Sequence, residues 1–134
     1  MKAPLIHIID KNPIHRNLVR YHLETGRFAK VAAFPSAEEC FYHIRHHECP
    51  DFIITTFFNG RPDGFRFMRD VETLAPGCRI LFFDLFDDHE LPGMLMQAGA
   101  TDYVAKTREP DAGITELVKN VKYLVRESIT AQVL

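Results

Sequence analysis

The sequence of 134 residues lacks an excess of positive charge, because 16 lysines and arginines stand against 18 aspartates and glutamates and the formal net charge is −2. A nucleic-acid backbone or an anionic membrane is held by a field of positive charge, which the chain as a whole does not supply. We therefore expect neither nucleic acid nor a membrane among its partners.

Long hydrophobic runs and paired cysteines are also missing. The first ten residues contain one lysine and a short apolar run interrupted by His7, which is too short for a signal peptide or a membrane span. Cys40, Cys49 and Cys78 are odd in number and form no CxxC pair. We interpret them as free, reduced thiols of a cytoplasmic protein.

Internal repeats, low-complexity tracts and a linker are absent too, so the sequence predicts one domain over 1–134, with its core at about 4–128. Five short apolar runs alternate with helical patterns, which is typical of a parallel sheet covered by helices on both faces. The runs are Leu5–Asp10, Phe28–Phe34, Phe52–Thr56, Arg79–Leu85 and Thr101–Ala105.

Each helical pattern has its own boundary signals. Asn12 followed by Pro13 predicts the start of the first helix, and Ser36 with Glu39 reads as a capping box that opens the second. The acidic run 87–90 fits the first turn of the fourth helix, where it would suit the helix dipole. The expected helices are about 13–25, 37–47, 64–75, 88–98 and 111–129.

This order of elements predicts an α/β fold, a flavodoxin-like doubly wound sheet of strand order 2-1-3-4-5 with five helices. In such a sheet, ligands bind beyond the carboxyl ends of the strands. A flavodoxin-like cofactor binder would need a turn rich in Ser, Thr or Gly after the first strand, but Lys11, Asn12 and Pro13 occupy that turn.

At the strand ends, the sequence resembles the receiver domain of two-component response regulators over nearly its whole length. The matching segments are Ile6–Pro13, Pro50–Thr56 continuing to Pro62–Gly64, and Ala98–Lys106. The resemblance implies a module of a two-component or phosphorelay signalling system. In that family, two adjacent acids end strand one, a phosphoryl-accepting aspartate ends strand three, a Thr or Ser ends strand four and a lysine ends strand five.

Three of these five positions depart from the family pattern. Asp10 and Lys106 match, but Lys11 replaces the second acid, Thr56 replaces the acceptor aspartate and Asp84 replaces the hydroxyl. We interpret the five residues as a degenerate phosphorylation pocket, a pseudo-receiver, in which a histidine kinase would not phosphorylate Thr56.

The replacements also argue against Mg²⁺, which binds oxygen ligands and usually one or two carboxylates. A lysine beside a cation would cost about 4 kcal/mol at an effective dielectric of about 20. Two acids and two lysines balance without a metal, so we expect Lys106 and Lys11 to form ion pairs with Asp84 and Asp10. We expect no metal, no cofactor, no catalytic residue and no enzymatic activity.

A docking face is expected where the fourth helix, fifth strand and fifth helix meet, because Tyr103 matches the aromatic switch position of the family. Met94, Tyr123 and Lys122 are expected on the same face, and Met and Tyr are adaptable contact residues. The expected partner is a kinase, another regulator or a second copy of the chain, bound without phosphorylation.

Several alternatives stay open. The protein could still accept a phosphoryl group on a non-standard residue, for which Asp10, Asp84 and Thr56 are the candidates. A separate Ser/Thr kinase could modify Thr55 or Thr56, but we favour the interpretation of both as ordinary β-branched strand residues.

Clustered side chains leave two further questions. The spacing of His43, His46 and His47 would permit metal ligation, but we favour the interpretation that they lie on a solvated helix face. Near the ends of two strands, Phe57, Phe58 and Phe86 would lie close to the crevice, where they could cover it or bind a partner.

Overall fold

The computed structural model describes residues 3–108 and 110–133, with side chains described except at 110, 111 and 130–133. The chain forms a five-stranded sheet of order β2-β1-β3-β4-β5, as predicted, and all neighbouring strands are parallel. The strands are β1 (Leu5–Ile9), β2 (Lys30–Phe34), β3 (Phe52–Thr55), β4 (Arg79–Asp84) and β5 (Asp102–Ala105).

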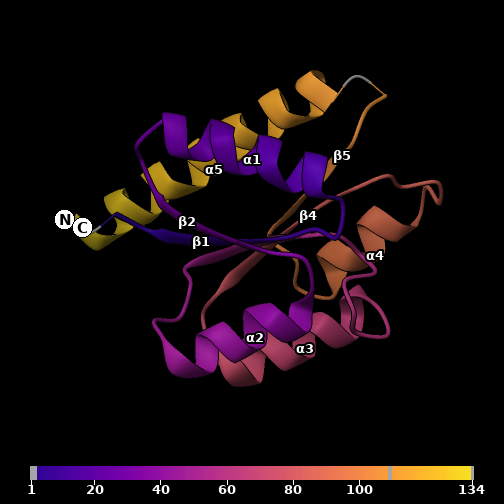
Figure 1. Cartoon of the computed structure of the whole chain (residues 1–134), viewed down its shortest axis with the longest axis horizontal. Coiled ribbons are helices and arrows are strands. Elements are labelled where there is room, and N and C mark those ends of the chain that lie inside the picture. Colours follow the sequence, from indigo (N-terminus) through magenta and orange to yellow (C-terminus); the bar gives the residue numbers. More distant parts are fainter. Residues whose placement is uncertain (1–2, 109, 134) are drawn as a thin grey trace.

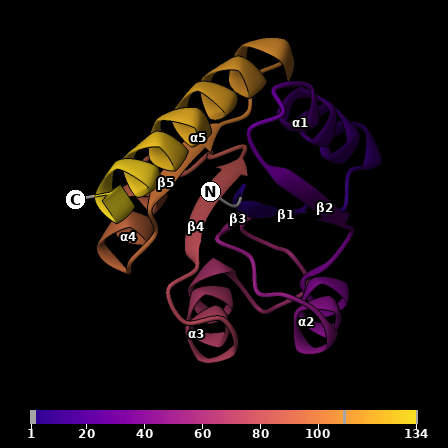
Figure 2. The same cartoon turned by 90° about the vertical axis from the view of Figure 1, so that its left-hand side faces the viewer.

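Helices cover both faces of this sheet (Figures 1 and 2). On one face lie α1 (Pro13–Thr25) and α5 (Pro110–Val133). On the other face lie α2 (Ala37–His46) and α3 (Gly64–Leu74), with the short α4 (Leu91–Gln97) beside β5. The sheet therefore separates two layers of helices.

Each layer has its own hydrophobic core. Successive residues of a strand point to opposite faces of a sheet, so Ile8 packs beneath α1 and α5 whereas Ile9 packs against α2 and α3. The last helix is amphipathic, and its apolar residues turn toward the sheet. These are Ile114, Leu117, Val121 and Val125, which are buried, and Val118 and Leu124, which are partly buried.

The helix caps read from the sequence form as predicted. The Asn12 side-chain oxygen accepts hydrogen bonds from the main-chain N–H groups of Ile14 and His15 at 2.9 and 3.2 Å. The Ser36 hydroxyl oxygen accepts one from the N–H of Glu39 at 3.3 Å. These bonds satisfy donors that a helix leaves unpaired at its first turn, and they fix where α1 and α2 begin.

The fourth helix begins three residues later than predicted. A helix starting at Asp88 would place Pro92 where a main-chain N–H should bond back to the Asp88 carbonyl, and proline has no N–H. Instead, the Asp88 side chain accepts a hydrogen bond from the N–H of Glu90 at 2.9 Å, and the helix starts at Leu91. The acidic run 87–90 is thus a loop and turn before α4, and the prediction for its place was wrong.

Two other boundaries also differ from the prediction. The last helix continues to Val133, beyond the predicted end at Ile129. The second strand begins at Lys30 rather than Phe28, because the chain turns just before it at Arg27, whose φ of 54° lies in the left-handed region. The strand β2 is therefore shorter at its start than the apolar run that predicted it.

All three cysteines are free thiols, as predicted. Burial raises the pKa of the Cys40 and Cys78 thiols to about 12, so both stay protonated and poorly nucleophilic at neutral pH. Within the described residues, no helix combines the length and apolar character that crossing a membrane requires.

Candidate functional site

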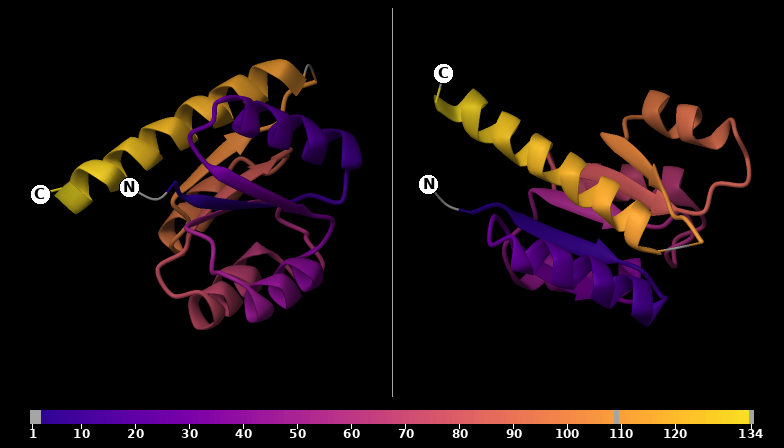
Figure 3. Two further views of the ribbon diagram at one scale, coloured as in Figure 1. Left: turned by 60° about the vertical axis from the view of Figure 1, so that its left-hand side comes forward. Right: turned by 90° about the horizontal axis from the view of Figure 1, so that it is seen from above.

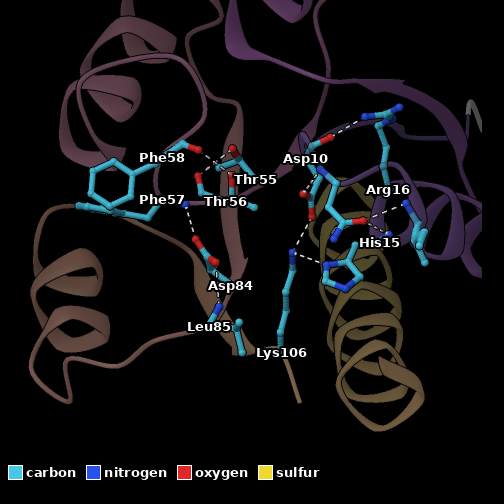
Figure 4. A network of polar contacts seen from close by, with 12 residues as sticks. Asp10, His15, Arg16, Thr55, Thr56, Phe57, Phe58, Asp84, Leu85 and Lys106 are labelled. Carbon is cyan, nitrogen blue, oxygen red and sulfur yellow. Dashed lines mark hydrogen bonds and ion pairs between the residues drawn. The ribbon is translucent and has the colours of Figure 1, made fainter. Parts of the chain in front are cut away.

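The carboxyl ends of β1, β3, β4 and β5 meet at one edge of the sheet, on the right of Figure 1. This arrangement places Asp10, Thr56, Asp84 and Lys106 around one site (Figure 4). Lys11 follows Asp10 and is exposed. In Figure 4 the polar contacts form two separate groups, one around Asp10 and Lys106 and the other around Asp84.

The first group is centred on an ion pair that is nearly closed to solvent. Lys106 Nζ lies 2.7 Å from Asp10 Oδ2, and the two side chains are 9% and 7% exposed. The other carboxylate oxygen, Asp10 Oδ1, accepts the main-chain N–H of Asn12 at 2.9 Å. Arg16 donates to the Asp10 carbonyl at 2.7 Å. Both carboxylate oxygens of Asp10 are therefore engaged by the chain itself.

His15 completes this group, and the sequence did not identify it. Lys106 Nζ donates to His15 Nδ1 at 2.9 Å, and the ammonium also lies 5.4 Å from the centre of the Phe83 ring. The sequence gives one indirect signal only: His15 lies in the first turn of α1, which the Asn12 cap holds above the strand ends.

The second group shows that half of the ion-pair prediction was wrong. Asp84 Oδ2 accepts the main-chain N–H of Phe57 at 2.8 Å, and Asp84 Oδ1 accepts that of Leu85 at 2.8 Å. Neither Asp84 nor Lys11 takes part in any of the ion pairs of the described residues. Two fixed main-chain donors satisfy the carboxylate without the entropy cost of ordering a long lysine side chain.

The Asp84 contacts join two loops. Phe57 belongs to the loop after β3 and Leu85 to the loop after β4, so the carboxylate holds both loops at the edge of the sheet. We call this arrangement the Asp84 clamp.

Thr56 and Thr55 turn their hydroxyl groups to the protein. Thr56 Oγ1 donates to the Phe58 carbonyl at 3.3 Å, and Thr55 Oγ1 donates to the Thr56 carbonyl at 3.0 Å. Asn59 donates its amide to Thr55 Oγ1 at 2.8 Å. Both threonines are buried. Their hydroxyls thus have structural hydrogen bonds of their own.

The donor set does not fit Mg²⁺. Asp10 has both carboxylate oxygens occupied, Thr56 offers a hydroxyl where the family supplies a carboxylate, and Lys11 brings a positive charge. In the described part of the chain, no three His, Cys, Asp or Glu side chains are grouped so that they could hold a metal ion.

Aromatic and aliphatic side chains border the site. Phe58 and Leu85 are 69% and 63% exposed, and Phe57 packs its ring edge-to-face against Phe58. Phe86 is partly buried in the core beneath α4 and meets Tyr103 edge-to-face, with ring centres 5.9 Å apart. Of these two neighbouring rings, Phe86 is therefore turned into the core and Tyr103 is exposed to solvent.

The residues expected on the docking face are not all on one side of the molecule. Met94, Tyr103 and Tyr123 are exposed on α4, β5 and α5, and Tyr123 also borders the groove that Lys122 lines beside α1. Lys122 instead lies over the ring of Phe28, with its ammonium 5.6 Å from the ring centre. Phe28 belongs to the core beneath α1 and α5, so Lys122 faces the α1 side of α5. Neighbouring residues of a helix point in directions about 100° apart, which separates the direction of Lys122 from that of Tyr123.

Away from the site, one histidine is fully buried. His7 Nδ1 lies 3.4 Å from Cys40 Sγ, and the His7 ring contacts Phe34 and His43. Burial, with a smaller effect of His43, lowers the pKa of His7 to about 4. The rings of His43 and His47 are stacked, with centres 4.2 Å apart.

The comparisons with known proteins agree with this fold. A family model described as the response regulator receiver domain matches residues 6–119. Among solved structures, a response regulator from Chloroflexus aurantiacus is 25% identical with a TM-score of 0.74, and the match covers 93% of this chain and 99% of that one. No curated protein matches the chain.

Two further structures are similar in fold. The signal receiver domain of NarL from Mycobacterium tuberculosis is 20% identical with a TM-score of 0.75, over 94% of this chain and 98% of that one. A response regulator protein from Burkholderia pseudomallei, solved with a phosphorylated aspartic acid and a calcium ion, is 20% identical with a TM-score of 0.66. That match covers 90% of this chain and 71% of the other.

Proposed function

The chain belongs to the response regulator receiver domain family of two-component signalling, and from this premise we propose that it acts through protein–protein contacts without being phosphorylated. The observation that carries the proposal is that the chain's own groups occupy the site. Asp10 is bound by Lys106 and the Asn12 N–H, and Asp84 is bound by two main-chain N–H groups.

The residue at the acceptor position supports this proposal. A receiver switches through a phosphoryl group on an aspartate, as in the Burkholderia relative with its phosphorylated aspartic acid. Thr56 has no carboxylate with which to form an acyl phosphate, and its hydroxyl is a weak nucleophile without a base that takes its proton. The hydroxyl already donates to the Phe58 carbonyl.

Charge balance supports the proposal from a second side. Phosphoryl transfer depends on metal ions and cations that neutralise the developing charge. Lys106, the one cation retained from the family pattern, is held by Asp10 and His15, and the remaining groups do not fit Mg²⁺. We therefore propose that the protein uses neither a metal nor a catalytic step.

The Asp84 clamp gives this domain a fixed state. Its carboxylate accepts main-chain hydrogen bonds from the loops after β3 and β4 without a phosphoryl group, and Tyr103 is exposed with Phe86 packed against its ring. We propose that the surface of Met94, Tyr103 and Tyr123 is therefore always presented to a signalling partner, a kinase or another regulator, in the cytoplasm.

The test is the intact mass of the purified protein after incubation with acetyl phosphate and Mg²⁺. We expect no added phosphoryl group on the wild type. The matched control is the triple variant Lys11→Asp, Thr56→Asp, Asp84→Thr, which restores the family pattern at all five positions and is expected to gain one phosphoryl group.

A stoichiometric phosphoryl group on the wild-type protein would overturn the proposal. It would favour the alternative, a non-standard acceptor, and fragmentation of the labelled protein would then identify it as Asp10, Thr56 or Asp84. Of these, Asp84 is the most exposed carboxylate at the site, so it is the first candidate.

A further inference from the structure

The loop before α4 carries concentrated negative charge. Asp87, Asp88 and Glu90 are all exposed, and none of them takes part in an ion pair of the described residues. The hydrogen bond from the Glu90 N–H to Asp88 fixes the turn but does not neutralise it. Leu85, 63% exposed, lies at the start of the same segment.

A basic groove lies on the other side of the sheet. It has a volume of about 540 Å³ and runs along α5 beside α1, with Ile114 and Val118 among its apolar lining and His22 contributed by α1. Lys119, Lys122 and Arg126 line it as well. Their spacing of three and four residues places the three cations along one stripe of the helix.

These two surfaces are complementary. The acidic segment offers three negative charges and an exposed leucine, and the groove offers the exposed cations of Lys119 and Lys122 around apolar side chains. The rest of the chain is nearly balanced, since the formal net charge is −2. We propose that copies of this chain associate head to tail, with segment 85–90 of one copy seated in the groove between α1 and α5 of the next.

The topology makes this contact intermolecular. The acidic segment leads into α4, which lies beside β5 and buries Leu95 in the core that α2 and α3 line, whereas the groove belongs to the layer of α1 and α5. Figures 2 and 3 show α4 at the outer edge of the sheet beside β5, whereas α1, which contributes His22 to the groove, lies on the other side of α5, so one copy does not place its segment in its own groove. A contact between two different surfaces does not close on itself as a two-fold dimer does, and further copies can add. The association requires no phosphoryl group.

Exposed charges make the contact sensitive to salt. Ions screen charges over about 10 Å at 0.1 M ionic strength, and over about 3 Å at 1 M. Sedimentation velocity of the full chain at up to about 200 µM is the first measurement. We expect the average mass to rise with concentration at low salt and to return to the monomer at high salt. A wild-type protein that stays monomeric at low salt overturns the inference.

Charge reversal locates the contact. The groove variant Lys119→Glu/Lys122→Glu and the segment variant Asp87→Lys/Glu90→Lys change exposed residues only, and each alone is expected to be monomeric. A chain with all four changes is expected to associate again, because its basic segment meets an acidic groove. The matched control, Arg69→Glu/Glu72→Lys on exposed positions of α3, should behave as the wild type does.

Three results contradict the proposal even if the wild type associates. The first is a groove or segment variant that associates as strongly as the wild type. The second is a four-change chain that stays monomeric although its circular dichroism and melting show that it is folded. The third is an assembly that stops at two copies and is unchanged in all charge-reversal variants, which would indicate a symmetric dimer through another face.

Discussion

At the scale of single residues, Lys106 joins two side chains of the site through a nearly buried ammonium group. Its ammonium group contacts a carboxylate at 2.7 Å and an imidazole at 2.9 Å, and its side chain is 9% exposed. Removing one partner of such a buried pair leaves the other charge without compensation, which costs about 3–5 kcal/mol. Lys106→Ala should lower the free energy of unfolding by this amount in a urea titration.

Lys11 provides the matched control for that experiment. It is the other lysine of the degenerate pocket, but it is exposed and takes part in none of the described ion pairs. Lys11→Ala should change the free energy of unfolding by less than about 0.5 kcal/mol. Equal losses in the two variants would mean that the Asp10 pair contributes nothing particular to the fold.

His7 makes stability depend on pH. Burial lowers its pKa from 6.5 to about 4, so between these values the unfolded chain binds a proton that the folded chain does not. The stabilising contribution is complete above pH 6.5 and is lost as the pH falls toward 4, by up to about 3 kcal/mol. Urea midpoints measured between these pH values should fall more steeply in the wild type than in His7→Leu.

An exposed histidine separates this effect from general acid destabilisation. His89 lies in the loop before α4, and His89→Gln should keep the steep dependence of the wild type. If His7→Leu follows the same curve as both, then titration of the buried ring does not govern the change.

Residue identities at the site could be read from the sequence, but their partners could not. Asp10 and Lys106 stand at strand ends that the apolar runs predict, so their meeting is a consequence of the parallel sheet. The contact of Lys106 with His15 joins residues far apart in the chain, and no spacing indicates it. Asp84 is bound by main-chain groups, which every residue has and which leave no mark in a sequence.

At the scale of elements, the first turn of α1 positions both Asn12 and His15. The Asn12 side chain accepts two main-chain N–H groups there. Loss of such a cap typically costs about 1 kcal/mol, so Asn12→Ala should lower the free energy of unfolding by that amount. The same substitution at exposed Asn17, within the helix, should cost nothing measurable in the same titration, since alanine favours helices.

Helix starts with a side-chain cap could be predicted closely, and the start of α4 could not. Asn12, Ser36 and Asp63 each accept a hydrogen bond from the helix that they precede. At α4, no side chain caps the helix at Glu90, and a turn held by Asp88 competes for the same residues. The acidic composition fits either arrangement, and the position of Pro92 decides between them.

At the scale of the whole molecule, the sheet divides the interior into two cores that share no side chain. Leu23 on α1 and Ile44 on α2 lie in different cores, and both are buried. Leu23→Ala and Ile44→Ala should each cost about 2–5 kcal/mol, and the double variant should cost their sum within about 0.5 kcal/mol. Denaturant unfolding of the three variants measures this.

The general architecture could be predicted because each strand is a short apolar run bounded by turn residues. Strands buried on both faces, such as Phe52–Thr55, lack the alternation of apolar and polar residues that would suggest a sheet with one face exposed to solvent. The charged surfaces were harder to predict. Lys122 was expected beside Tyr103, but helix geometry turns it toward Phe28 and α1.

The contact between Lys106 and His15 also fixes the protonation pattern of a ring. An ammonium group has hydrogens to donate and no lone pair, so His15 Nδ1 must accept and cannot carry a proton. While this hydrogen bond holds, the contact selects the tautomer whose hydrogen lies on Nε2. Nitrogen-15 chemical shifts distinguish the two ring nitrogens, so the shift of His15 Nδ1 reports whether its contact with Lys106 is formed. In Lys106→Ala, the same ring would be free to exchange between tautomers.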